Sequence, residues 1–178
     1  DADEIIIATG AKHILPDIEG INKDFVMTAV DLLEGKAHAG SKVVIIGGGM
    51  IGCETAEFIA DYGIDVTILE MTDEIGQDIP IVPKPKLLKR LDNLGVKEFT
   101  NAQATSIGEN KVKYDKDGEE HIIEDVETVV IAVGMKSKNE LYNQIKDIQR
   151  PVHVIGDAHN VARIMDDLEE VYEQLINI

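Results

Sequence analysis

The sequence predicts an α/β fold with a central, mostly parallel β-sheet. Two apolar strands, Lys42 to Ile46 and Asp65 to Glu70, flank a segment whose apolar residues recur at helical spacing, which is the pattern of a β-α-β unit. A run of glycines joins the first strand to this helix. The 178 residues are 44% hydrophobic but only 4% aromatic, so the core must be aliphatic, as is typical of parallel strands covered on both faces.

Further elements are predicted on both sides of this unit. Short buried strands are expected at residues 4–8 and 128–133, each followed closely by glycine, and a helix is expected at 86–94 after a proline-rich loop. Four short alternating segments predict an antiparallel meander: 96–101, 104–108, 111–115 and 119–123. The meander is expected to form an extra layer beside the parallel sheet.

The two ends of the chain have weaker patterns. Residues 11–39 contain scattered Pro and Gly and resemble a connector, with a short helix expected after a Thr28 cap. A last strand is expected at 152–155. One apolar stripe predicts a C-terminal helix: Ile164, Leu168, Val171, Tyr172, Leu175 and Ile176.

Charge and cysteine content exclude several classes of function. The formal net charge of −17 would repel nucleic acids and anionic membranes. No apolar run approaches the roughly 20 residues of a membrane span. The single cysteine, Cys53, cannot form an internal disulfide, and the five histidines show no metal-ligand spacing. We therefore expect a cytoplasmic protein without a metal site.

The segment Gly47 to Gly52 fits the dinucleotide-binding pattern G-x-G-x-x-G. It follows a strand and opens a helix, which is the context that makes this pattern specific. Gly47 would allow the tight turn, Gly49 would let the backbone approach a pyrophosphate, and Gly52 would let the helix pack on the strand. Met50 and Ile51 would present first-turn amides to the phosphates. The alternative is a glycine-rich turn that binds nothing.

Glu70 ends the second strand, 18 positions after Gly52. A carboxylate there can accept hydrogen bonds from the adenosine ribose, and it would repel the additional phosphate of NADP. Residues 71–74 include no Arg or Lys that could bind that phosphate. The sequence therefore favours NAD over NADP, unless Glu70 is only a solvated residue at the strand end.

Four ordered motifs carry a family resemblance: Ala8-Thr9-Gly10, Gly47 to Gly52, Ala132-Val133-Gly134 and Gly156-Asp157. In this order they resemble the pyridine nucleotide–disulfide oxidoreductase type of flavoprotein, in which an NAD(P)H domain is inserted into an FAD domain. The sequences of residues 49–57 and 69–76 are similar to those of one branch of this family. That branch is the 2-enoate reductase and 2,4-dienoyl-CoA reductase group, also called NADH:flavin oxidoreductases.

The resemblance implies a role for each motif. NAD(H) would be bound by Gly47, Gly49, Met50, Ile51, Gly52, Glu70 and Gly134. In a larger parent protein, FAD would be bound by Thr9, Gly10, Gly156 and Asp157. Glu54, two residues after Gly52, is a possible catalytic group near the nicotinamide and flavin. It could equally be a first-turn acid that complements the helix dipole.

The resemblance also implies a domain plan. Residues 1–39 would be an FAD-domain remnant and connector, 40–136 the Rossmann-like NAD(H)-binding domain, and 137–178 the return segment and C-terminal helix of the FAD domain. The expected partners are the rest of the FAD domain, with its own fingerprint, and an N-terminal flavin-bearing TIM barrel. The implied function is hydride delivery from NADH to FAD in the parent.

The residues leave two alternatives to this plan open. One is a complete, non-catalytic NAD(H)-binding or regulatory module, and the other is a small reductase that takes flavin from a partner chain. Under the parent hypothesis, the chain alone should neither retain FAD nor oxidise NADH. Exposed apolar surface on its flanks would then favour a homodimer, or disorder in those flanks.

Overall fold

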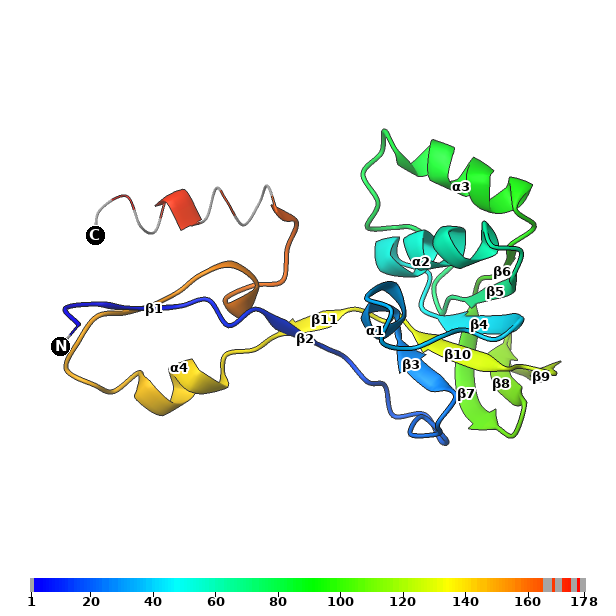
Figure 1. Ribbon diagram of the computed structural model, residues 1–178, viewed down its shortest axis with the longest axis horizontal. Helices are drawn as coiled ribbons and strands as arrows, with labels where there is room; N and C mark the ends of the chain where they lie inside the picture. The colour runs from blue at the N-terminus through cyan, green and yellow to red at the C-terminus, as the bar shows by residue number, and fades with distance from the viewer. Residues whose placement is uncertain (1, 165–167, 169–170, 174–175, 177–178) are drawn as a thin grey trace. The chain divides into compact units, whose positions relative to one another are not determined.

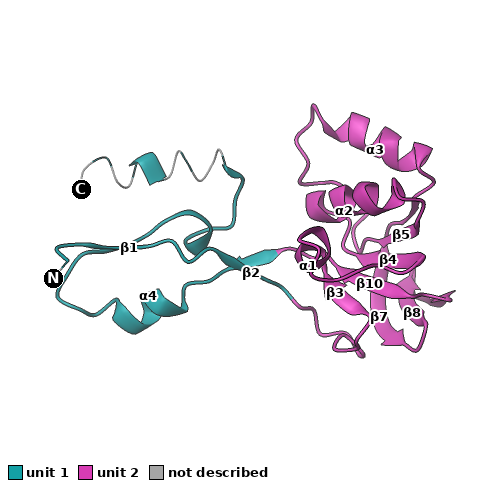
Figure 2. Ribbon diagram, in the orientation of Figure 1, with its two compact units in different colours: residues 1–14, 135–178 teal, residues 15–134 magenta. Residues whose placement is uncertain are grey.

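The computed structural model describes residues 2–164, 168, 171–173 and 176, and it divides into two compact units (Figures 1 and 2). Unit 1 combines the two ends of the chain, Asp1–Ile14 and Met135–Ile178. Unit 2 is the continuous stretch Leu15–Gly134. The middle of the chain thus forms a unit of its own, with the two ends brought together in the other.

A five-stranded parallel sheet forms the centre of unit 2 (Figure 1). In spatial order its strands are β3 (Val26–Thr28), β10 (Thr128–Ile131), β4 (Lys42–Ile46), β5 (Asp65–Leu69) and β6 (Lys97–Phe99). The three central strands are rich in Val and Ile, whose branched side chains suit a pleated, buried surface. The predicted α/β class is confirmed.

Helices cover one face of this sheet and a second sheet covers the other (Figure 1). The helices are α1 (Ala29–Leu33), α2 (Met50–Ala60) and α3 (Lys84–Asn93). The second sheet is antiparallel, with strands β7 (Ala102–Gly108), β8 (Lys111–Lys116) and β9 (Glu119–Glu124). Because side chains alternate along a strand, Val43 and Ile45 of β4 pack with the helices, and Val44 and Ile46 pack with the second sheet.

Local sequence signals placed several elements correctly. Strand β4 has the predicted bounds, and Thr28 caps α1 by accepting the Asp31 amide at 3.1 Å. Asp117 and Gly118 form the predicted hairpin turn between β8 and β9, with φ values of 58° and 82°. Positive φ at both positions is what the tight hairpin requires.

One prediction about pairing was wrong. Strand β6 was expected to open the meander, but it pairs in parallel with Thr67–Leu69 of β5, since α3 carries the chain back across the sheet. The predicted FAD-domain remnant and connector spans residues 1–39. The structure groups residues 15–39 of this stretch with unit 2, because β3 pairs with β10 and Ile18 is buried against β7.

The boundaries of the compact units therefore differ from the predicted domain limits. The first falls between Ile14 and Leu15 rather than after residue 39, and the second falls between Gly134 and Met135 rather than after residue 136. The pairing of β3 with the central strand β10 explains the first difference, since it adds a fifth strand to the sheet.

Unit 1 contains two small strand pairs. Strands β1 (Ile5–Ile7) and β12 (Val152–Val154) are parallel, and strands β2 (Ala11–His13) and β11 (Met135–Ser137) are antiparallel. Unit 1 also contains a helix, α4 (Glu140–Ile145), and a 3-10 turn, η1 (Gly156–Ala158).

Much of the apolar surface of unit 1 is exposed. On the predicted C-terminal stripe, four described residues face solvent: Ile164, Leu168, Tyr172 and Ile176. Leu175 lies outside the described residues. In β1 the side chain of Ile6 is 48% exposed, whereas Ile7 is buried. Within the described parts, no helix combines the length and apolar character needed to cross a membrane.

Candidate functional site

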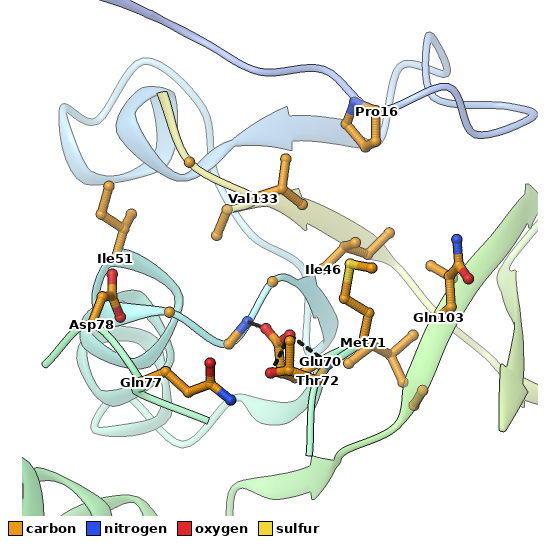
Figure 3. Close-up of a pocket in the computed structure, with 18 of the residues that line it drawn as sticks. Pro16, Ile46, Ile51, Glu70, Met71, Thr72, Gln77, Asp78, Gln103 and Val133 are labelled. Carbon is orange, nitrogen blue, oxygen red and sulfur yellow. Dashed lines mark hydrogen bonds between the residues drawn. The ribbon is translucent and has the colours of Figure 1, made fainter. Parts of the chain in front are cut away.

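A cavity of about 470 Å³ opens in unit 2 at the carboxyl ends of β4, β5 and β10 (Figure 3). Ligands of open α/β sheets characteristically bind at this edge. Five segments line it: 16–18, 46–51, 69–78 in part, 102–104 and 132–134. The glycine turn, Glu70 and Gly134 are thus brought to one place from separate parts of the sequence.

The glycine turn is too tight for side chains at its first and last glycines. Gly47 has a φ of 106°, and a Cβ there would lie 2.5 Å from the Ala132 carbonyl oxygen. A Cβ on Gly52 would lie 2.0 Å from the Gly47 carbonyl oxygen. Gly52 therefore lets α2 start directly against the turn, and it does not itself line the cavity.

The open end of α2 faces the cavity. Its N-cap, Gly49, has no side chain to accept from the helix, and the first intrahelical bond runs from the Cys53 amide to the Gly49 carbonyl at 2.9 Å. The amides of Met50, Ile51 and Gly52 therefore have no intrahelical carbonyl. The Met50 amide donates instead to the carboxylate of Asp78 at 2.7 Å.

Glu70 is held in position by three donors (Figure 3). Its Oε2 accepts the Gly48 amide at 2.7 Å, and its Oε1 lies 2.8 Å from the Thr72 amide and 2.9 Å from the Thr72 hydroxyl. A carboxylate has about four lone-pair sites. One site on Oε2 is left for a further donor, and the carboxylate is already oriented to receive it.

The cavity carries no basic side chain to balance its acids. Asp17, Glu70, Glu74 and Asp78 line it, and none of the described lining residues is Lys or Arg. Lys84, which does not line the cavity, pairs with the lining residue Glu74 at 3.1 Å. An anionic ligand would therefore depend on backbone amides and on the positive end of the α2 dipole.

A family model supplies the identification. The model for pyridine nucleotide-disulphide oxidoreductases matches residues 1–154. The chain belongs to this family. The four motifs that suggested the resemblance all fall in the matched stretch or directly beyond it.

Several oxidoreductases resemble the chain along nearly all of its length. It is 36% identical to an NADH oxidase from Thermoanaerobacter brockii, with 96% of the chain covered, and 35% identical to a cinnamate reductase from Clostridium sporogenes, with 99% covered. A solved 2-naphthoyl-CoA reductase complex matches with a TM-score of 0.91 and 34% identity over 99% of the chain. These relatives agree with the predicted 2-enoate reductase group.

The chain spans 27% of the length of each of these three relatives. The family and its flavoprotein members imply that the chain binds FAD, NAD(P) or both. Its relatives also indicate that such a module operates within a larger oxidoreductase.

In this family member the predicted FAD residues lie in unit 1. Thr9 and Gly10 follow β1, and Gly156 and Asp157 follow β12. Because β1 and β12 are parallel neighbours, both motifs follow the carboxyl ends of adjacent strands. Asp157 accepts the Ala162 amide at 3.2 Å, which fixes the turn after β12.

Glu54 lies apart from the cavity. It was expected in the first turn of the helix, but α2 begins at Met50, its first turn contains no acid, and Glu54 follows it. The dipole explanation for Glu54 is therefore wrong. Its exposed side chain borders a separate surface depression beside Glu57 and Phe58.

Cys53 is a packing residue. Its side chain is fully buried, and its thiol donates to the Gly48 carbonyl at 3.3 Å. Burial, together with the nearby carboxylates of Glu98, Asp78, Glu70 and Glu54, raises the pKa of the Cys53 thiol to about 12. The thiol therefore stays neutral near pH 7, which is the opposite of a reactive cysteine.

The sequence did not reveal all the residues at the cavity. Asp78 and Gln103 line it, yet neither stands in a motif. A polar residue in a loop after a strand has many possible partners, and its position depends on how that loop folds back. Among the residues that the structure describes, no group of three or more His, Cys, Asp or Glu could hold a metal ion.

Proposed function

We propose that unit 2 binds NADH and that, in a larger parent enzyme, it presents the nicotinamide so that hydride passes to FAD. One observation carries this proposal: the glycine turn, the open end of α2 and the oriented carboxylate of Glu70 meet at a single cavity of about 470 Å³. The protein contributes binding and orientation, and the hydride chemistry belongs to the cofactors.

In this proposal each feature recognises one part of the dinucleotide. The pyrophosphate lies at the start of α2, where the amides of Met50 and Ile51 and the helix dipole favour negative charge. A ribose hydroxyl donates to the remaining lone pair of Glu70 Oε2. Gly134, at the end of the segment after β10, lines the cavity with a φ of 108° and leaves room for the ligand.

The first prediction concerns the choice between NADH and NADPH. We expect NADH to bind at least about tenfold more tightly, because the 2′-phosphate of NADPH would stand against the carboxylate of Glu70 with no basic residue to balance it. Glu70→Ala should weaken the binding of NADH and reduce the difference between the two affinities to about threefold or less. Calorimetric titration of both nucleotides measures this.

Glu109→Ala is the matched control for that experiment. Glu109 is an exposed glutamate outside the cavity, so its removal changes the net charge equally but should leave the ratio of affinities unchanged. Equal affinity of the wild type for the two nucleotides, or tighter NADPH, would contradict the proposal.

We further propose that unit 1 contributes to an FAD site in the parent, through Thr9, Gly10, Gly156 and Asp157. Support comes from the parallel pairing of β1 and β12, which brings the two motifs to the same end of adjacent strands. The exposed apolar residues of unit 1 would then contact another domain or a second copy of the chain. Glu54 does not line the cavity, so its possible role near the nicotinamide and flavin stays a prediction.

A second prediction follows for the flavin. The chain has one G-x-G-x-x-G fingerprint, which we assign to NADH, so the 178-residue chain alone should purify without flavin absorbance. It should likewise show no steady NADH oxidation with a dye acceptor when no flavin is added. Flavin bands in the visible absorbance spectrum of the purified chain would contradict this expectation.

A further inference from the structure

We propose that Asp78 is an internal competitor of the dinucleotide pyrophosphate, which occupies the start of α2 when the cavity is empty and is displaced when the ligand binds. The inference rests on the proposed function and adds a regulatory residue to that site. Asp78 would thereby hold the affinity of the cavity below what its backbone amides could provide.

The position of the Asp78 carboxylate carries the first step. Its Oδ1 accepts the Met50 amide at 2.7 Å, and its two oxygens lie 3.2 and 3.3 Å from the point where a Cβ on Gly49 would be. Figure 3 shows Asp78 beside Ile51, at the start of the helix. The carboxylate therefore fills the space over Gly49 that the G-x-G-x-x-G pattern keeps free for a phosphate.

The loop that carries Asp78 is attached to the glycine turn. The Gly76 amide donates to the Gly48 carbonyl at 2.6 Å, and Gly76 has a positive φ of 64°. Asp78 is thus held close to α2 by a backbone bond that does not involve its own side chain.

The side chain of Asp78 can leave without unfolding this loop. Its bond to the Met50 amide is solvent-exposed, and the carboxylate lines the open cavity. A rotation about the Asp78 side-chain bonds would free the amide and keep the bond between Gly76 and Gly48. The exchange therefore replaces one anion at the helix end by another.

This exchange lowers the net gain from binding. A phosphate oxygen must take over a donor that already has a charged acceptor, so the ligand gains only the difference between two charge-assisted bonds. The displaced carboxylate also stays near the cavity and repels the ligand. Removing Asp78 should therefore tighten binding, although it removes a favourable contact from the empty protein.

ADP-ribose is the probe for the test, because it has both phosphates and cannot be oxidised or reduced by a nicotinamide or flavin. By calorimetric titration, Asp78→Ala should bind it about tenfold more tightly than the wild type, and Asp78→Asn about threefold. The asparagine variant keeps the shape of the side chain and loses the charge. In the absence of ligand, Asp78→Ala should unfold at a slightly lower temperature.

Asp73→Asn is the matched control, since it removes a charge from the same loop without touching the Met50 amide. It should change the affinity by less than about twofold. A gain in Asp73→Asn equal to that in Asp78→Asn would overturn the inference, because net charge would explain both. If the wild type binds ADP-ribose and both Asp78 variants bind it equally or more weakly, this inference is overturned and the proposed function is not. Absence of binding by every protein would overturn the proposed function as well.

Discussion

Substituting Gly49 by valine is expected to abolish dinucleotide binding and leave the protein folded. Gly49 has a φ of −69°, which any residue can adopt, and a Cβ there would meet only the end of the Asp78 side chain, at 3.2 and 3.3 Å. The valine side chain would, however, occupy the place proposed for the pyrophosphate. We expect the affinity for NADH to fall by at least about a hundredfold.

The size series Gly49→Ala and Gly49→Val provides the control. Gly49→Ala should lower the affinity for NADH by an intermediate factor, on the order of tenfold, because a single methyl group intrudes less on the place proposed for the pyrophosphate. Circular dichroism and thermal unfolding of both variants would verify that they fold. Binding of NADH by Gly49→Val at wild-type strength would show that the glycine turn is not the binding site.

Gly52→Ala is expected to destabilise the protein itself. Its Cβ would lie 2.0 Å from the Gly47 carbonyl oxygen and 3.0 Å from the Gly47 carbonyl carbon, both backbone atoms that cannot rotate away. Either α2 or the turn after β4 must move. We expect a loss of about 3 kcal/mol in the free energy of unfolding, within the range for overpacked cores. Urea unfolding in the absence of ligand measures it.

Gly63→Ala separates this clash from ordinary backbone strain. Gly63 has a φ of 80°, and a Cβ added there would meet open space, with no neighbouring atom within 4 Å. The substitution should therefore cost only the strain of a left-handed alanine, about 1 kcal/mol. Equal losses in the two variants would mean that the contact between α2 and the glycine turn does not limit stability.

The sequence predicted the parts of the fold that depend on nearby residues. Strand β4, the glycine turn and α2 follow one another within about 20 positions, and each has its own local signal in apolar periodicity or glycine spacing. Glu70 was a candidate for the same reason, since the end of β5 can be located from the pattern of that strand. The structure adds its hydrogen bonds to Gly48 and Thr72.

The features that were missed depend on contacts between distant residues. Strand β6 has three residues, and nothing within Lys97–Phe99 indicates whether its partner is β5 or the next strand along the chain. The pairing of β3 with β10 joins residues about 100 positions apart, so local patterns could not assign β3 to the sheet. Asp78 likewise meets Met50 across 28 positions through the fold of a loop.

The pairing of β2 with β11 has a consequence for how such a protein could have arisen. His13 and Met135 are direct partners in this antiparallel pair, so the chain leaves for unit 2 and returns from it at neighbouring points. A continuous stretch whose two ends lie side by side can be inserted into, or removed from, a host protein in a single genetic event without stretching the host backbone. Residues 15–134 meet that condition, so this stretch is suited to transfer between host proteins as a single unit.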